Sequence, residues 1–251
     1  MFNYRYWLIF IIGGMCVDYG HANNLWHKIA PGIEYYEIQK TKISPWSKIH
    51  VFKISLKFNR LSLAIATDTS TKTAAVVHDY ARLSKAMLAI NGGFFDENYR
   101  PLGLRIREAH QLSPLRPISW WGIFYVHHGM PHITNIKHFS VNKQIAFAVQ
   151  SGPRIIIDGH IPRLKSGFAE RSSLGITRDH RVILLVTEHV ALSTSALAKL
   201  MRSAPLNCIQ ALNLDGGSSS QLYANIDNFT LDVRGLAAIS DSIIVLSTPT
   251  V

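Results

Sequence analysis

The stretch ALNLDGGSSS, residues 211–220, places a carboxylate, two glycines and three serines directly behind an apolar run. Asn213 and Asp215 alternate with leucines, and alternate residues of a strand share one face. The stretch therefore predicts the end of a buried strand that presents both polar side chains on the same side. A glycine turn follows, which lets the backbone approach a ligand closely. The alternative is a surface turn in which Asp215 bonds its own backbone.

Elsewhere the chain alternates apolar and polar residues, which indicates half-buried strands. Strands are predicted over 32–40, 48–59, 61–67, 87–90, 120–126, near 132–139, 147–159 and 208–214, and a hairpin over 172–187 that turns near 178–180. Helical spacing predicts helices over 73–84 and 194–203, the second with Ser193 or Thr194 as its N-cap. The predicted fold class is α/β, as a mixed α+β single domain with largely antiparallel or mixed sheets and a few packed helices.

The composition is that of a globular protein, with 47% hydrophobic and 17% charged residues over 251 positions. No repeat or low-complexity tract divides residues 23–251, so a single domain is expected there. The net charge of +10 favours anionic partners. The lysines and arginines are scattered, without a run of five or six, which argues against a nucleic-acid partner.

Residues 1–22 have the pattern of a secretion signal. Arg5 precedes the apolar run WLIFIIGGM, residues 7–15, and small residues ending at Ala22 predict cleavage after that position. The run is shorter than the about 20 residues of a membrane-spanning helix, so no stable span is expected after removal of the signal. The pattern predicts a secreted or periplasmic protein.

The chain has two cysteines. Cys16 lies in the predicted signal, which leaves Cys208 without a partner for an internal disulfide. The apolar neighbours of Cys208 predict a small buried core residue rather than a nucleophile.

Further polar, glycine-bearing segments stand at the ends of predicted strands: NGGFFD (91–96), PLGLRI (101–106), QSGPR (150–154) and ERSSLGI (170–176). Each alone is typical of a turn. Their recurrence in one domain indicates a shared binding site.

In order and approximate spacing, INGGFF, LGL, QSGPR, R-x-x-L-G-I and LNLDGGSSS resemble the phosphodiester glycosidase family over about residues 73–245. One difference is Ser218, where many members have another glycine. The resemblance implies a secreted hydrolase that cleaves a sugar-1-phosphodiester, of the N-acetylglucosamine-1-phosphate type, at the glycosidic C–O bond. The products would be a sugar and a phosphomonoester, and the implied partner is an anionic sugar phosphate or glycan.

The resemblance also implies roles for single residues. The catalytic set is Asp215, with Asp96 as the second carboxylate, and Arg171. Phosphate contacts are expected first from Arg105 and Arg171 and then from Arg154, because arginine's planar fork matches phosphate oxygens. The other candidates would bind substrate: the backbone N–H groups of Gly92, Gly93, Gly216 and Gly217 around an anion, and Asn91, Gln150, Ser151, Gly152, Asn213, Ser218 and Ser219 nearby.

Several points stay open from sequence. Asn91 and Asn213 would either bind sugar hydroxyls or fix the loops. Asp215 would be a nucleophile, a base or an electrostatic group. No cofactor is required for this chemistry, and a divalent cation near Asp215 or Asp96 is not excluded.

Three other functions fit the sequence less well. A serine hydrolase using Ser218 to Ser220 lacks the G-x-S-x-G pattern. A metal-dependent phosphodiesterase would need clustered histidines, and adjacent strand residues such as His127 and His128 point to opposite faces. A non-catalytic periplasmic or surface glycan-binding module would lose its carboxylates or arginines, and these are present.

Overall fold

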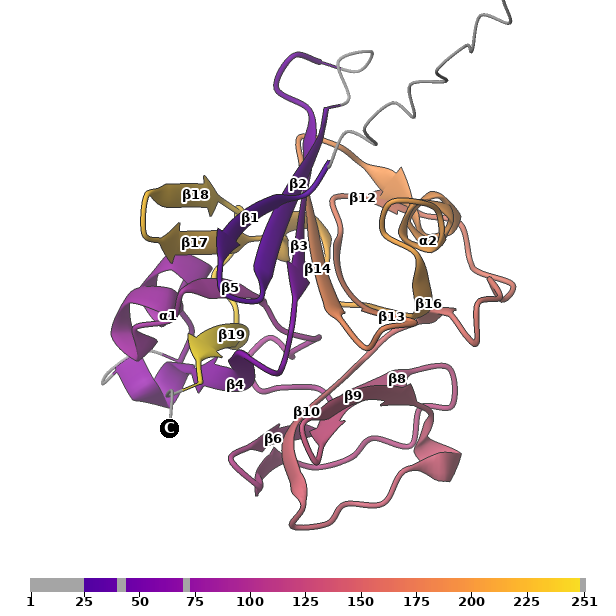
Figure 1. Ribbon diagram of the computed structural model, residues 1–251. Helices are drawn as coiled ribbons and strands as arrows, with labels where there is room; N and C mark the ends of the chain where they lie inside the picture. Colours follow the sequence, from indigo (N-terminus) through magenta and orange to yellow (C-terminus); the bar gives the residue numbers. More distant parts are fainter. Residues whose placement is uncertain (1–24, 40–43, 70–72, 249–251) are drawn as a thin grey trace, which may run out of the picture.

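A computed structural model describes residues 25–39, 44–69 and 73–248 of the chain. Within these ranges the protein is built mainly of strands, flanked by two α-helices, α1 (Val77–Ser84) and α2 (Thr194–Arg202) (Figure 1). The prediction of largely antiparallel sheets is confirmed, because the strand pairings are antiparallel. The α/β class is corrected to a β-rich fold, because the two-residue alternation of apolar and polar residues that is typical of strands dominates the sequence. The predicted signal, residues 1–22, lies outside the described residues.

The described residues form three large sheets. The seven-stranded sheet has the order β1 (His27–Ala30), β2 (Ile33–Gln39), β3 (Lys48–Ile54), β14 (Val182–Glu188), β13 (Ser172–Thr177), β16 (Cys208–Asn213) and β11 (Arg154–Ile156). A five-stranded sheet has the order β18 (Phe229–Val233), β17 (Leu222–Ile226), β5 (Leu88–Asn91), β19 (Asp241–Ser247) and β4 (Asn59–Ile65). The other five-stranded sheet has the order β7 (His110–Ser113), β6 (Arg105–Arg107), β10 (Ile145–Ser151), β8 (Gly122–His127) and β9 (Met130–Thr134).

Shorter elements connect these sheets. A small ribbon pairs β12 (Phe168–Ala169) with β15 (Leu192–Ser193), next to α2. Three 3₁₀ turns are η1 (Ala66–Thr69), η2 (Ile136–His138) and η3 (Gly217–Ser219), the last within the DGGSSS segment. No helix in the described part of the chain is long and apolar enough to cross a membrane.

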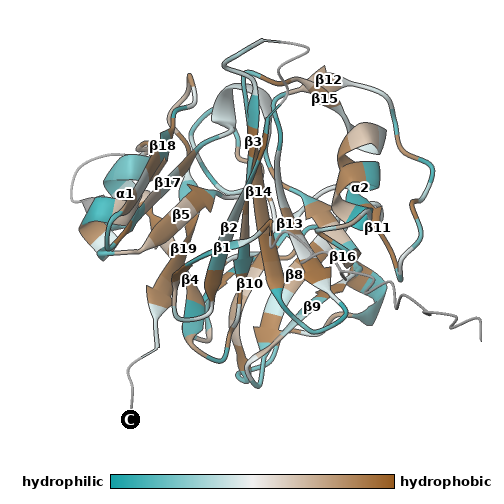
Figure 2. Ribbon diagram, turned by 45° about the horizontal axis from the view of Figure 1, so that its top comes forward, coloured by the Kyte–Doolittle hydropathy of each residue, from teal (hydrophilic) through white to brown (hydrophobic). Residues whose placement is uncertain are grey.

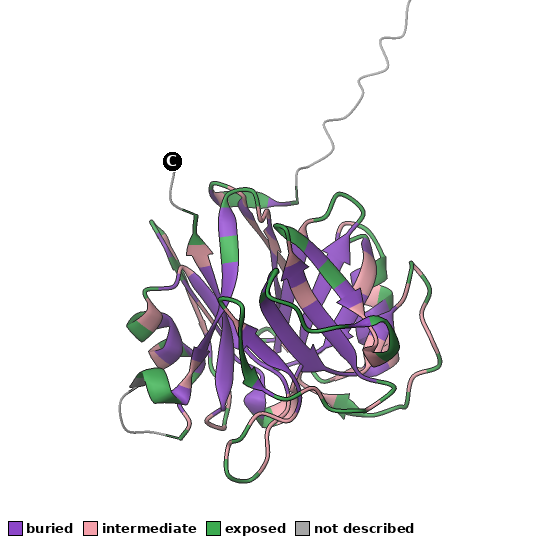
Figure 3. Cartoon of the chain, turned by 90° about the horizontal axis from the view of Figure 1, so that it is seen from below, coloured by how far each residue is buried: buried purple, intermediate pink, exposed green. Residues whose placement is uncertain are grey.

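One apolar core is shared by all three large sheets. Phe52 of β3, Ile90 of β5 and Phe147 of β10 are fully buried in the same cluster. Strand alternation places the neighbouring residues of β3, Ile49 and Val51, on the opposite face, where they pack in the cluster beneath α2. The strands are accordingly brown over much of their length in Figure 2 and mostly purple in Figure 3. The three sheets are therefore held together by one core.

Both helices were predicted, and one begins later than expected. Residues 73–76 are not helical because Ala75 forms a β-bridge with Ile239. The N–H of Val77, the first residue of α1, donates to Gln221 Oε1 at 3.0 Å, although Gln221 is 144 positions away in the sequence. In α2 the Ser193 side chain accepts the Ala196 N–H at 3.1 Å, which confirms the predicted N-cap. Cys208 is 2% exposed in the core beneath α2, as predicted.

Candidate functional site

The DGGSSS segment follows the end of β16 and is tied to the end of β5. The strand ends at Asn213, so Asp215 lies in the following turn rather than on the strand itself. The Asp215 N–H donates to Gly92 O at 3.3 Å, and Asn91 Nδ2 donates to Asp215 O at 2.8 Å. The segments NGGFFD and LDGGSSS therefore form one site, as their resemblance to the same family implied, although Asn91 and Asp215 are 124 positions apart in the sequence.

Asn91 acts as the clamp of this junction. Its side chain is fully buried, and its Oδ1 accepts from Ser172 Oγ at 2.6 Å and from the Gln221 N–H at 3.2 Å. With Nδ2 bound to Asp215 O, the amide joins four segments of chain. Of the two roles left open for Asn91, the structure supports the loop-fixing one. Ser172 and Gln221 belong to this clamp and were not identified from sequence.

The Asp215 carboxylate is partly buried and held in place by its own turn. Its Oδ1 accepts the Gly216 N–H at 3.0 Å, and the Ser219 side chain also hydrogen-bonds to it. Burial raises the pKa of Asp215 above its ordinary 3.8, against the opposing effect of these two hydrogen bonds. The charge of Asp241 adds to the rise in pKa, and that of Arg105 opposes it. A carboxyl group with a raised pKa in a polar turn is characteristic of functional sites.

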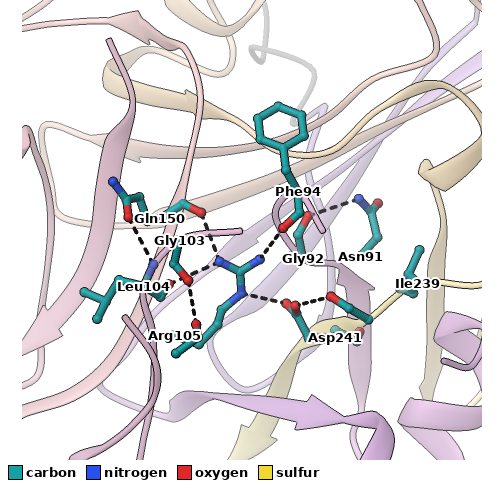
Figure 4. Close-up of polar contacts among 12 residues, drawn as sticks. Asn91, Gly92, Phe94, Gly103, Leu104, Arg105, Gln150, Ile239 and Asp241 are labelled. Atoms are coloured by element: carbon teal, nitrogen blue, oxygen red, sulfur yellow. Dashed lines mark hydrogen bonds and ion pairs between the residues drawn. The ribbon is translucent and has the colours of Figure 1, made fainter. Parts of the chain in front are cut away.

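Beneath this turn lies a buried ion pair between Arg105 and Asp241 (Figure 4). Arg105 Nε donates to Asp241 Oδ1 at 3.0 Å, and both side chains are 0% exposed. The remaining guanidinium nitrogens donate to the carbonyls of Leu104, Gln150 and Phe94 at 3.1, 3.0 and 3.4 Å. Each nitrogen of the Arg105 guanidinium, predicted as a phosphate contact, thus donates to a partner inside the protein.

Asp241 is the partner that the sequence analysis missed. It begins β19, and its Oδ2 accepts from Ser240 Oγ at 2.6 Å. A single acidic residue ahead of the apolar run in SDSIIVL is its only sequence signal. Buried charges are rarely tolerated without a partner, so that signal becomes meaningful only when paired with Arg105.

Gly92 is required by the packing of this ion pair. A Cβ atom on Gly92 would lie 1.8 Å from Asp241 Oδ1. We expect Gly92→Ala to lower the free energy of unfolding by about 1–3 kcal/mol or more, because the carboxylate must shift away from Arg105. Gly167→Ala is the control, since a Cβ atom there meets nothing within 4 Å. Equal urea midpoints for the two variants would contradict the assignment.

The QSGPR segment joins the site from the end of β10. Gln150 and Ser151 are fully buried, and a cis peptide bond links Gly152 to Pro153. Asn213 Nδ2 donates to Gly152 O at 3.1 Å, which fastens this segment to the end of β16. Gln150 and Ser151 therefore belong to a segment that is bonded to the end of β16, just before the Asp215 turn.

Arg154 and Arg171 use part of their hydrogen-bonding capacity within the protein. Arg171 Nε donates to Leu192 O at 2.9 Å, and its Nη2 donates to Gly167 O. Arg154 Nη2 donates to Gln210 Oε1 at 3.3 Å, so its guanidinium lies along β16 rather than toward the turn at its end. Burial lowers the pKa of both guanidinium groups.

Asp96 lies in a turn of its own. Its Oδ1 accepts the N–H groups of Asn98 and Arg100 at 2.9 and 2.8 Å. This is the behaviour of an aspartate that stabilises a loop.

Three of the four backbone N–H groups predicted to bind an anion have internal partners. Gly92 N donates to Asp241 O at 3.0 Å, Gly216 N to Asp215 Oδ1, and Gly217 N to Glu170 O at 2.8 Å. Gly93 packs against Arg105, because a Cβ atom there would lie 2.8 Å from Arg105 Nη2. These glycines shape the turn by close backbone approach.

Ser218 and Ser219 differ in their exposure. The Ser218 side chain is exposed, whereas Ser219 is buried and bonds to Asp215. Among the described residues, no group of three or more histidine, cysteine, aspartate or glutamate side chains could hold a metal ion.

Unpartnered polar atoms gather at this site. Buried side-chain atoms without a hydrogen-bond partner among the described residues include Trp121 Nε1, Ser151 Oγ, Arg154 Nε, Asn213 Oδ1 and Ser220 Oγ. All of these belong to the segments described above or to the start of β8 beside them. Leaving a buried polar atom unpaired costs about 1–3 kcal/mol, which a bound polar ligand could offset.

Comparison with known proteins identifies relatives of the chain. The sequence profile of the phosphodiester glycosidase family matches residues 84–246. A region of 163 residues is 33% identical to the uncharacterized protein YigE of Escherichia coli (strain K12), covering 59% of this chain and 62% of that protein. The match thus spans less than two thirds of the relative's length.

Two solved structures share the fold. The catalytic domain of zebrafish N-acetylglucosamine-1-phosphodiester alpha-N-acetylglucosaminidase, auto-inhibited by its pro-peptide, superimposes with a TM-score of 0.67 at 16% identity, covering 87% of this chain and 85% of that one. A hypothetical protein from Synechocystis superimposes with a TM-score of 0.62 at 17% identity, covering 87% of this chain and 63% of that one. At these identities the likeness shows the fold alone. The family profile, in contrast, covers all the segments that build the site, and the chain belongs to the phosphodiester glycosidase family.

Proposed function

We propose that the protein hydrolyses a sugar-1-phosphodiester, of the N-acetylglucosamine-1-phosphate type, at the glycosidic C–O bond. The observation that carries this proposal is the partly buried Asp215 carboxylate, in a turn whose neighbouring segments contain buried polar atoms that lack partners. Ser151 Oγ and Asn213 Oδ1 are buried acceptors without partners among the described residues, in two of the segments that meet beside the Asp215 turn. The family assignment supports the same reaction class.

The chemistry requires a carboxylate more than a general acid. The departing phosphomonoester is a weak base and needs little protonation, unlike the alcohol that leaves an ordinary glycoside. Positive charge develops on the sugar ring as the C–O bond breaks. Ionised Asp215 would stabilise that charge, as a nucleophile at the anomeric carbon or as the base that activates water. No cofactor is needed for either route.

The hydrogen-bond network holds Asp215 in position for this role. Asn91 fixes its backbone carbonyl, and Ser219 and the Gly216 N–H orient its carboxylate. The buried Arg105–Asp241 pair supports the turn from below through Gly92, whose carbonyl accepts the Asp215 N–H. Such support restricts the carboxylate to one geometry before substrate arrives.

The pH dependence of turnover follows from the shift in the Asp215 pKa. Because the carboxylate is the active form and its pKa is raised, kcat/KM is expected to rise with pH through a value above 3.8. Ser219→Ala removes a hydrogen bond that lowers this pKa, so the acid limb is expected to move to higher pH. Ser218→Ala, at an exposed neighbouring position, should leave the limb in place. If neither substitution moved the acid limb of the pH profile, the limb would not report the ionisation of Asp215.

Export is part of the proposal. The signal-like residues 1–22 would direct the protein to the periplasm or the medium, and the charge of +10 suits an anionic envelope or extracellular glycan. Expression of the full chain in a bacterium and mass spectrometry of the exported product would test this. The expected mature N-terminus is Asn23.

A panel of substrates tests the reaction. Residues 23–251 would be incubated with an N-acetylglucosamine-1-phosphate ester, a nucleotide sugar and a neutral aryl glycoside of the same sugar. Release of free sugar from the phosphodiesters alone is the expected result. Binding of the phosphodiesters without any release would favour the glycan-binding module instead.

A further inference from the structure

Three large apolar side chains, termed the apolar rim, are more exposed than any other in the described part of the chain. Trp46 is 74% exposed, Phe168 77% and Leu236 95%. The next most exposed large apolar side chain within the described ranges is Trp120, at 59%. Single exposed apolar residues are ordinary on a protein surface. What distinguishes the apolar rim is its position in the fold.

The apolar rim adjoins the end of the seven-stranded sheet that carries the Asp215 turn. The register places Asn213 of β16 opposite Ser173 of β13, and Glu188 of β14 opposite Lys48 of β3. The start of β3, the end of β14, the start of β13 and the end of β16 therefore share one end of the sheet. Both ribbon views show the start of β3 and the β12–β15 ribbon at this end of the molecule (Figures 1 and 2).

Leu236 extends from a loop that packs on the DGGSSS segment. The Leu236 N–H donates to Ser218 O at 2.9 Å, and the Ala237 N–H donates to the same carbonyl at 3.0 Å. A Cβ atom on Gly235 would lie 2.6 Å from Ser218 O, so the two backbones are in close contact. The backbone of Leu236 is thus held against the segment while its side chain is in solvent.

Phe168 is attached to the same segment through Glu170, two residues further along the chain. Glu170 O accepts the Gly217 N–H at 2.8 Å, and a Cβ atom on Gly216 would lie 2.8 Å from that carbonyl oxygen. Phe168 itself pairs with Ser193 in the β12–β15 ribbon. Its backbone is therefore fixed beside the Asp215 turn although its ring is exposed.

Trp46 reaches this end of the sheet from the turn before β3. The Trp46 N–H donates to Ser44 Oγ at 3.2 Å, and the Oγ of the next residue, Ser47, donates to His189 O at 2.8 Å. The His189 N–H donates to Glu170 Oε1 at 2.9 Å. Glu170 therefore links the loops of two rim residues, Trp46 and Phe168, to the turn that contains Asp215.

Cationic side chains accompany the apolar rim. Arg163 and Lys165 are exposed in the segment that leads to Phe168, and neither side chain has a hydrogen bond or ion pair within the described ranges. Residues 161–169 contain no aspartate or glutamate, and the whole chain has a net charge of +10. Free cations of this kind are attracted to anionic lipid headgroups.

The arrangement matches a lipid surface better than a protein partner. Protein interfaces have a contiguous, closely packed apolar core. The apolar rim instead consists of single side chains on three separate loops, with cations next to one of them. Tryptophan, phenylalanine and leucine inserted at the headgroup level, with lysine and arginine beside them, are typical of proteins that lie on a membrane.

We propose that the apolar rim inserts into the headgroup region of an anionic membrane, where Arg163 and Lys165 contact lipid phosphates. Docking in this orientation places the end of the sheet that carries the Asp215 turn against the bilayer. The inference does not rest on the proposed function, because membrane binding requires no turnover.

Binding of residues 23–251 to lipid vesicles tests the proposal. These residues contain the whole described core and omit the apolar run 7–15, which would bind lipid by itself. Vesicles of phosphatidylethanolamine with phosphatidylglycerol are the anionic probe, and phosphatidylcholine vesicles are the neutral one. Co-sedimentation should show tighter binding to the anionic vesicles, weakened by added salt. A protein that does not bind the anionic vesicles would overturn the proposal.

Substitutions in the apolar rim should weaken this binding without changing the melting temperature. Trp46→Ala, Phe168→Ala and Leu236→Ala are each expected to lower vesicle affinity about threefold to tenfold, because each removes apolar area from the lipid contact. The combined variant should bind at least about thirtyfold more weakly. Arg163→Gln with Lys165→Gln should lower affinity for the anionic vesicles about tenfold to thirtyfold and leave the neutral ones unaffected.

The opposite end of β3 supplies the matched control. Lys57 Nζ lies 5.8 Å from the centroid of the Phe58 ring, and Phe58 is 47% exposed, so a cation and an exposed aromatic ring are again neighbours. Phe58→Ala and Lys57→Gln should leave vesicle binding unchanged, since the length of β3 separates them from the apolar rim. Losses equal to those of the rim variants would show non-specific adsorption and overturn the proposal.

A second measurement distinguishes insertion from adsorption by charge alone. Lipids with bromine-labelled acyl chains quench tryptophans that enter the bilayer, so part of the fluorescence should be quenched on binding. Trp46→Phe should retain binding and lose part of that quenching, because phenylalanine preserves an apolar ring. Binding that depends on Arg163 and Lys165 but persists in the combined rim variant would indicate a site for anionic polymers and overturn membrane insertion.

Discussion

Replacing Asp215 by asparagine is expected to lower kcat by about a hundredfold to ten-thousandfold, the range typical of a positioned acid–base group. The melting temperature should stay unchanged or rise at neutral pH. Burial raises the pKa of Asp215, so folding favours its protonated form, and that contribution to stability is lost as the pH rises through the folded pKa. Asparagine has no charge to bury. The difference in melting temperature between Asp215→Asn and the wild type should therefore become small at acidic pH.

Asp96→Asn is the comparison for this variant. Asparagine can accept the same two backbone N–H groups through its own Oδ1, so both the loop and turnover are expected to persist. Steady-state kinetics and circular dichroism melting curves of both proteins make the measurement. Full activity in Asp215→Asn, with loss in Asp96→Asn, would move the catalytic carboxylate to the NGGFFD segment.

Replacing Asp241 by alanine is expected to lower the free energy of unfolding by about 3–5 kcal/mol, the cost of leaving a buried charge without its partner. Arg105 is 0% exposed and cannot reach water without displacing the chain around Gly92 and Gly93. Chemical denaturation of the variant measures the loss. Activity should fall as well, because Gly92 supports the Asp215 turn.

The double variant Arg105→Met with Asp241→Leu is the control for this pair. Replacing both ions by apolar residues is often neutral or stabilising, so much of the lost stability should return. A double variant as unstable as Asp241→Ala alone would show that the effect is one of packing rather than of charge. A loss below about 1 kcal/mol in Asp241→Ala would contradict the ion pair as a buried, obligatory contact.

Much of the central sheet was predictable from sequence, because its strands are long and regularly patterned. The hairpin of β13 and β14 and the strands β2, β3 and β16 lie where alternation predicts them. The five-stranded sheet of β18, β17, β5, β19 and β4 was predicted only in part. Strands β17, β18 and β19 were not predicted. The first residues of β19 are polar but buried, so the strand does not show the usual alternation of buried apolar and exposed polar residues.

The membership of the site was easier to predict than the role of each residue. Glycine-rich segments mark strand ends, so Asn91, Gln150 and Asp215 were found by local pattern. Their partners come from distant positions: Arg105 pairs with Asp241, and Gln150 holds Arg116. Arginine as a residue type indicates phosphate binding or a buried ion pair equally well, and only three-dimensional contacts distinguish the two.

The central claim, cleavage of the glycosidic C–O bond at the Asp215 site, is tested most directly by the position of an oxygen label. Residues 23–251 would hydrolyse an N-acetylglucosamine-1-phosphodiester in heavy-oxygen water, with mass spectrometry of both products. The account predicts the label in the free sugar, an unlabelled phosphomonoester, and loss of both products in Asp215→Asn. Label in the phosphate would contradict it, because the P–O bond would then be the one that breaks.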